Sequence, residues 1–153
     1  MLNKNLKIII TIGSILIVAI LGSIFVNIGM DWFNGLTKPS MWIPSFVIPI
    51  VWTIIYLSFT IILTKWINVK EIPPKTAILL ALNGILNIIW CLLFFTLKQT
   101  FLGNITIIIN CIFGYILIFN IYSQNNLYGK ILIIYPIWLS IATSLNTAIW
   151  ILN

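Results

Sequence analysis

Residues 31–45, with the sequence DWFNGLTKPSMWIPS, form a polar and aromatic stretch between two long apolar runs near the start of the chain. The stretch contains two of the seven tryptophans, two prolines and one of the two acidic residues. It is too long for an ordinary turn between two helices, which usually takes roughly two to eight residues. We therefore expect residues 29–45 to form a capping loop that covers a pocket between membrane helices.

The composition excludes several classes of protein. Of the 153 residues, 61% are apolar and 7% are charged, which is too apolar for a soluble domain of this size. The net charge of +6 comes from lysines that separate apolar runs, so we expect no nucleic-acid partner. Arginine and histidine are absent, which removes the usual groups for bidentate phosphate binding, for histidine ligation of metal or haem, and for imidazole catalysis. Cys91 and Cys111 lie within apolar runs, which favours buried thiols over a disulfide.

Five apolar runs are each long enough to cross about 30 Å of hydrocarbon, which requires roughly 20 helical residues. Every lysine and both acidic residues fall between these runs or at their ends. The sequence thus predicts an all-α integral membrane protein with one domain, a single bundle of five transmembrane helices in the lipid bilayer. The first run follows two lysines, as in a signal peptide, but its length and the lack of a small-x-small cleavage site favour a retained span. The predicted spans are residues 8–28, 46–66, 77–97, 102–122 and 131–151.

The lysines also predict the orientation of the bundle in the cell membrane. Because the connections alternate between the two sides, six lysines lie on the side of the N-terminus and two, Lys38 and Lys98, lie opposite. The positive-inside rule then places the N-terminus in the cytoplasm and residues 31–45 outside. Since the links after the second span are short, we expect consecutive helices to be antiparallel neighbours.

Polar and aromatic residues recur at helical spacing within three of the spans, which places them on single helix faces. An asparagine that faces lipid would leave amide groups unpaired at a cost of several kcal/mol, so these faces should point inward. Two interpretations remain open: the asparagines join helices through hydrogen bonds, or they line a cavity together with indole rings. The three faces are Asn83, Asn87, Trp90 and Phe94; Trp138, Ala142 and Asn146; and Pro49, Trp52 and Tyr56.

A cavity of this kind would suit a flat, conjugated and mostly apolar ligand. Indole faces provide area for stacking, amides orient the ligand, and Lys38 offers a cation for a peripheral carboxylate. The spans contain no buried carboxylate or lysine for a proton relay, which argues against a proton-coupled transporter. The sequence has no Ser-His-Asp set, no metal-ligand cluster and no glycine-rich phosphate loop, so we predict no metal site and no required cofactor.

Three segments resemble the motifs of one family of membrane proteins. LTKPSMWIPSFVIPIVWTIIY (36–56) is similar to the first-loop and second-helix signature of the TspO family of tryptophan-rich sensory proteins, which are related to the translocator protein or peripheral benzodiazepine receptor. LNGILNIIWCLLFF (82–95) is similar to the asparagine-tryptophan pattern of the third helix in that family, and YPIWLSIATSLNTAIWILN (135–153) to its ending. The chain departs from these motifs at Met41, Ile43, Cys91 and the pair Tyr135-Pro136, which bears on ligand preference more than on fold.

The resemblance implies a five-helix membrane protein that forms a homodimer. It also implies that the protein binds porphyrins, such as protoporphyrin IX or haem, and synthetic aromatic ligands in a pocket capped by the first loop. In some bacterial members, porphyrin breakdown under light and oxygen is attributed to two tryptophans that match Trp52 and Trp138. Carried over by position, the residues of the pocket would be Trp32, Phe33, Pro44, Trp52, Tyr56, Asn87, Trp90, Cys91, Trp138, Ala142 and Asn146.

Four functions are compatible with the sequence. The first is a membrane receptor or sensor for porphyrin-type tetrapyrroles and similar flat aromatic ligands. The second is a porphyrin-degrading enzyme in which Trp52 and Trp138 would be catalytic. The third is a translocator of small molecules, although the five spans lack the inverted repeat that many transporters show. The fourth is a structural partner protein.

Overall fold

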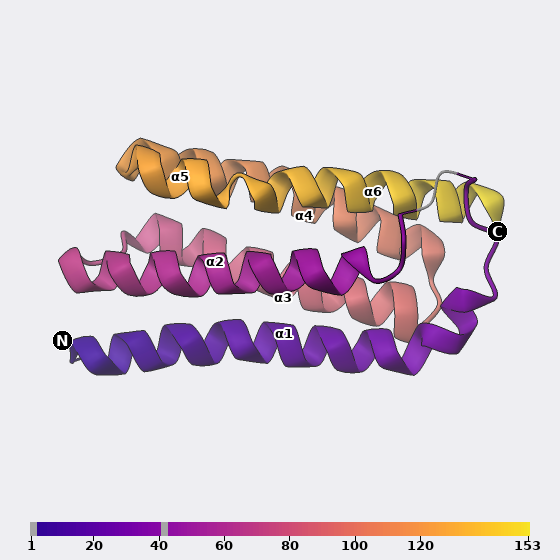
Figure 1. Ribbon diagram of the computed structural model, residues 1–153, viewed down its shortest axis with the longest axis horizontal. Helices are drawn as coiled ribbons and strands as arrows, with labels where there is room; N and C mark the ends of the chain where they lie inside the picture. The colour runs from indigo at the N-terminus through magenta and orange to yellow at the C-terminus, as the bar shows by residue number, and fades with distance from the viewer. Residues whose placement is uncertain (1–2, 41–42) are drawn as a thin grey trace.

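The computed structural model describes residues 3–40 and 43–153, and all of the regular elements in those ranges are helices. Five helical segments are long and apolar enough to cross a membrane, which confirms the membrane bundle predicted from the sequence. They run side by side along one long axis (Figure 1). The elements are α1 (Lys4–Asn34), α2 (Val47–Val69), α3 (Pro74–Cys91), the π-helix η1 (Leu92–Thr96), α4 (Thr100–Gln124), α5 (Asn126–Leu132) and α6 (Ile134–Leu152).

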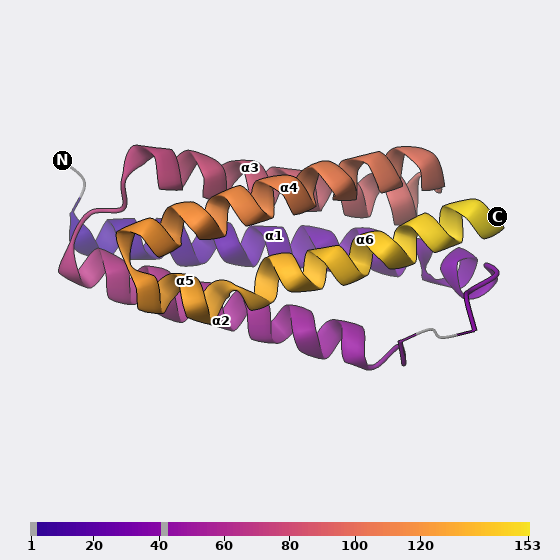
Figure 2. The same cartoon turned by 90° about the horizontal axis from the view of Figure 1, so that it is seen from above.

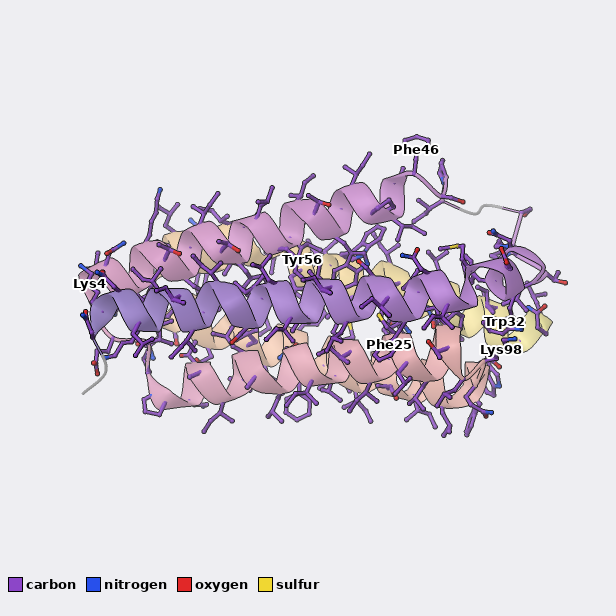
Figure 3. All side chains as sticks on the ribbon, turned by 90° about the horizontal axis from the view of Figure 1, so that it is seen from below. Lys4, Phe25, Trp32, Phe46, Tyr56 and Lys98 are labelled. Carbon is purple, nitrogen blue, oxygen red and sulfur yellow. The ribbon has the colours of Figure 1, made fainter. Side chains whose placement is uncertain are left out.

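The helices form a closed ring in which α1 packs against α2 and α3, α4 packs against α3 and α6, and α2 packs against α5 and α6. The expectation that consecutive helices are neighbours is wrong for the backbone packing of α2 and α3, which meet through side chains while α1 packs against both (Figure 3). The link between these helices is extended at Lys70 and at Pro73. Such a link spans about 16 Å from Val69 to Pro74, more than the roughly 8–10 Å between packed helix axes.

Two helices differ from their predicted spans for identifiable reasons. The helix α1 continues to Asn34, six residues past the predicted end at residue 28, because hydropathy marks depth in the membrane and not the end of a helix. The last span starts earlier, at Asn126, and is interrupted between Leu132 and Ile134. Pro136 lacks the amide hydrogen that would bind the carbonyl of Leu132, and its ring crowds that carbonyl, which explains the interruption.

The bundle has two ends that matter for the site. The N-terminal end carries the start of α1, the α2–α3 link and the α4–α5 link, whereas the loop end carries residues 35–40 and 43–46, the η1–α4 link and the C-terminus (Figures 1 and 2). One buried apolar cluster, which includes Trp66 and Leu132, joins α2, α3, α4, α5 and α6. A second, which includes Phe33 and Phe94, joins α1, α3, η1, α4 and α6. Trp52 packs against both clusters.

Candidate functional site

A pocket of about 530 Å³ lies between α1, α2 and α3, where the backbones of α2 and α3 lie farther apart than those of the packed helix pairs. Leu117 of α4 and Tyr135 of α6 also line it. Its volume falls within the range of roughly 300–1,000 Å³ that small-molecule sites occupy. The walls consist mostly of aliphatic side chains, among them Ile15 and Val18 of α1, Ile55 and Leu63 of α2, and Leu80 and Ile88 of α3.

Two stacked aromatic rings of α2 form the most distinctive part of the wall. The rings of Trp52 and Tyr56 lie 5.6 Å apart between centroids, at an angle of 26°. Their positions one helical turn apart put both side chains on the same face of α2. The indole of Trp90 backs Trp52 at 6.3 Å but does not line the pocket. A flat apolar ligand would thus meet an extended aromatic surface on one side.

Two asparagines of α3 reach the pocket, and only one of them has an unpaired polar atom. Asn83 donates to the carbonyls of Leu79 and Phe113 and accepts from the hydroxyl of Tyr135. Asn87 donates from Nδ2 to the hydroxyl of Tyr56 over 3.2 Å, while its Oδ1 is buried without a partner in the described part of the chain. If the amide were turned over, Nδ2 would be the unpaired atom instead.

An unpaired amide atom in a buried position is costly, so it indicates either a structural imperfection or a missing partner. Over the described residues, Thr64, Trp66, Asn110, Trp138 and Thr143 also keep one buried polar atom without a partner, but none of these lines the pocket. Asn87 is therefore the residue whose unpaired atom a ligand in the pocket could satisfy.

The residues predicted to form the site fall into two groups. Trp52, Tyr56, Asn83 and Asn87 line the pocket together. Trp90 and Asn146 are instead buried against each other, with a hydrogen bond of 3.0 Å from indole to amide, which is the helix-joining role left open above. The others that lie within the bundle and outside the pocket lining are Phe33, Cys91, Trp138 and Ala142, each buried in the packing between helices.

The first six residues of the predicted capping loop, 29–34, belong to α1, so that part of the prediction is wrong. The other described residues of the loop contact the ends of α1 and α6 and do not line the pocket. Lys38 donates to the carbonyls of Phe33 and Asn34 and lies 4.8 Å from the ring of Phe33, so it caps the last turn of α1. The amide of Asn153 forms two hydrogen bonds with the backbone of Thr37. Trp32 packs edge-on against Phe94, Pro44 is exposed, and Met41 and Trp42 lie outside the described residues.

The structure adds pocket residues that the sequence reasoning did not select, on α1 and on the small-residue face of α3. Thr11 and Ser14 line the pocket from α1, where their hydroxyls donate to carbonyls of the preceding turn. Ala77, Ala81 and Gly84 line it from α3. Their spacing at i, i+4 and i+7 is a signal that the sequence does contain, because small side chains on one helix face leave room beside it.

Comparison with known proteins decides the family. The profile of the TspO/MBR family matches residues 11–151, which is nearly the whole chain. The chain belongs to the TspO/MBR family. This confirms the resemblance found in the three sequence motifs, and it identifies the five-helix bundle as that of a multi-pass membrane protein.

Relatives of this TspO/MBR protein match over most of their length. It is 30% identical over 152 residues to the tryptophan-rich protein TspO of Archaeoglobus fulgidus, with 97% of each chain covered. It is 29% identical to the tryptophan-rich protein TspO of Chlorobaculum tepidum, with 99% of each chain covered. It is also 25% identical to the protein CrtK of Rhodobacter capsulatus, over 80% of this chain and 78% of the relative.

Proposed function

We propose that this protein is a membrane receptor or sensor that binds porphyrin-type tetrapyrroles and similar flat aromatic ligands in the pocket between α1, α2 and α3. The observation that carries the proposal is the stacked pair Trp52 and Tyr56 beside the one unpaired amide atom of Asn87. The rings provide a face for stacking, and the amide and the Tyr56 hydroxyl provide polar groups that orient the ligand.

Metal-free protoporphyrin IX fits this wall better than haem does. The chain has no histidine, so an axial ligand to haem iron from the pocket would have to come from a tyrosine hydroxyl. We propose that the protein requires no cofactor and that the porphyrin is its ligand. Binding is preferred to oxidative breakdown because only one of the two tryptophans that breakdown would use, Trp52, lines the pocket.

The proposed receptor is a homodimer, as the family resemblance implies, with its N-terminus in the cytoplasm. Lysines 4, 7, 65, 70, 75 and 130 belong to the N-terminal end, against Lys38 and Lys98 at the loop end, which favours this orientation. A C-terminal fusion to alkaline phosphatase should therefore be active in a bacterial host. An inactive phosphatase together with a fluorescent C-terminal green fluorescent protein would reverse the orientation.

The test of the proposed function is a titration in the dark with protoporphyrin IX, using protein in nanodiscs of zwitterionic lipid and empty nanodiscs as the blank. The wild type should shift the porphyrin absorbance band saturably, at one porphyrin per chain. Trp52→Phe should weaken binding about fivefold to tenfold, because part of the stacking surface is lost. Trp138→Phe is the matched control, since its ring is buried outside the pocket, and it should bind as the wild type does. Equal affinities for all three, or no saturation above the blank, would refute the proposal.

A further inference from the structure

A second cavity lies at the N-terminal end and adjoins the pocket. It has a volume of about 580 Å³ and is formed by the start of α1, the end of α2 and the α2–α3 link. Four residues line both cavities, so the two cavities are direct neighbours: Ile10, Thr11, Ile72 and Ala77. The apolar pocket therefore adjoins a cavity at the N-terminal end of the bundle, whereas none of the described residues 35–40 and 43–46 lines it.

The second cavity differs from the pocket in its charge. Lys4, Lys7 and Lys70 line it, and Glu71 is its one acidic residue, so it has two positive charges in excess. Lys7 forms an ion pair with Glu71. The ammonium of Lys4 donates to the carbonyl of Asn68 over 3.1 Å, and that of Lys70 lies 5.7 Å from the ring of Trp66. Neither of these contacts neutralises the lysine, so Lys4 and Lys70 remain cations available to an anion.

The loop end offers no comparable anion site at the pocket. No lysine lines the pocket itself over the described residues, and Lys38 is held by carbonyls at the end of α1. The pocket walls extend along α3 from Ala77 to Ile88, a rise of about 16 Å. A long planar molecule can therefore lie in the pocket with one edge at the shared residues and its polar substituents in the basic cavity.

We infer that the two cavities together bind one amphiphilic dianion: a planar apolar ring in the pocket, with two carboxylates on one edge that face Lys4, Lys7 and Lys70. This inference rests on the proposed porphyrin function and adds the orientation of the ligand. It places the carboxylates at the N-terminal end, whereas the sequence suggested Lys38 at the loop end. It also gives Glu71 a role, because its carboxylate competes with the ligand for Lys7.

The experiment compares protoporphyrin IX, which has two carboxylates, with its dimethyl ester, which has the same ring and no charge. Both are titrated in the dark into protein in nanodiscs of zwitterionic lipid, at low and high salt, so that anionic headgroups do not compete. Wild type should bind the diacid more tightly than the ester, and added salt should reduce that preference. In Lys7→Gln/Lys70→Gln the diacid should bind about threefold to tenfold more weakly, with the ester unchanged.

Two further variants sharpen the test. Glu71→Gln should bind the diacid more tightly than wild type does, since Lys7 loses its competing carboxylate. Lys65→Gln is the matched control, because it removes one exposed lysine on α2 that lines neither cavity, and it should keep the wild-type preference.

The inference is overturned if Lys38→Gln removes the preference for the diacid while Lys7→Gln/Lys70→Gln retains it. Equal weakening of diacid and ester in the lysine variant would also overturn it, because that result means a structural effect without a carboxylate contact. Failure of the wild type to bind either porphyrin would instead refute the proposed function itself. Binding of both porphyrins with equal affinity would leave the proposed function standing and refute only the orientation.

Discussion

Asn87 and Asn146 both lie on inward faces of membrane helices, yet they differ in whether their polar atoms are paired. The amide of Asn146 accepts from the indole of Trp90 and donates to the carbonyl of Ala142. Asn87 is paired only through Nδ2, to Tyr56. One asparagine therefore has its polar atoms engaged within the fold, and the other has one atom free for a ligand.

We predict opposite effects for leucine at these two positions. Asn87→Leu should weaken porphyrin binding without lowering the thermal unfolding midpoint, because it removes an amide with an unpaired atom. Asn146→Leu should lower the unfolding free energy by about 1–3 kcal/mol, because it leaves the Trp90 indole without an acceptor. Thermal unfolding in detergent and the dark titration measure the two effects separately. Unchanged affinity in the stable Asn87→Leu protein would exclude this residue from the ligand site.

At the scale of helices, the backbone of α1 lies directly against the π-helix η1 at Gly29. A methyl group at Gly29 would collide with the backbone carbonyl of Phe95, which cannot rotate away as a side chain could. Gly13 lies in the same helix, and a methyl group there would meet nothing within 4 Å. Close packing of α1 on η1 thus depends on the missing side chain at Gly29.

Gly29→Ala should therefore destabilise the protein by about 1–3 kcal/mol, the usual cost of overpacking. Gly13→Ala should be neutral or stabilise by up to about 1 kcal/mol, because alanine favours a helix more than glycine does. Unfolding midpoints of the two variants, measured in the same detergent, test this pair. A Gly29→Ala protein as stable as Gly13→Ala would contradict the close approach of α1 to η1.

The sequence predicted the helices well because charges and hydropathy report directly on membrane depth. It could not predict the end of α1 at Asn34, which depends on Lys38 folding back onto carbonyls of the last turn. It also could not predict that Asn146 is fully paired and Asn87 is not, because helical spacing shows which face points inward but not which side chains of the other helices lie opposite. The packing of α1 against both α2 and α3 depends on the extended link after Val69. The length of this link alone would allow α2 and α3 to pack directly on each other or to lie apart.

At the scale of the whole molecule, an ion pair between Lys7 and Glu71 joins the start of α1 to the α2–α3 link. The hydrogen bond and the charge of Lys7 lower the pKa of Glu71 below its ordinary value. A carboxylate with a lowered pKa in the folded protein adds stability above its unfolded pKa, near 4.3, and that stability is lost as the pH falls through the folded value. Acidification through the lowered pKa of Glu71 should therefore release this end of α1.

Unfolding midpoints measured between about pH 3 and pH 6 should fall more steeply in the wild type than in Glu71→Gln. The difference should be small and should shrink in high salt, because the Glu71 side chain is 70% exposed. Parallel pH profiles for the two proteins at low salt would show that the pair does not stabilise the fold.

The closed ring also has a consequence for synthesis. Tyr135 belongs to the last helix and lines the pocket, and α2 meets α5 and α6 across the ring. A growing chain that has inserted α1 to α4 therefore has only part of the pocket wall, and α2 still lacks a neighbour on one side. The pocket becomes complete only when the final helix leaves the translocon, so a ligand of the proposed site would stabilise finished chains and not nascent ones. Supply of the ligand would then control how long completed copies survive in the membrane, and not how many are begun.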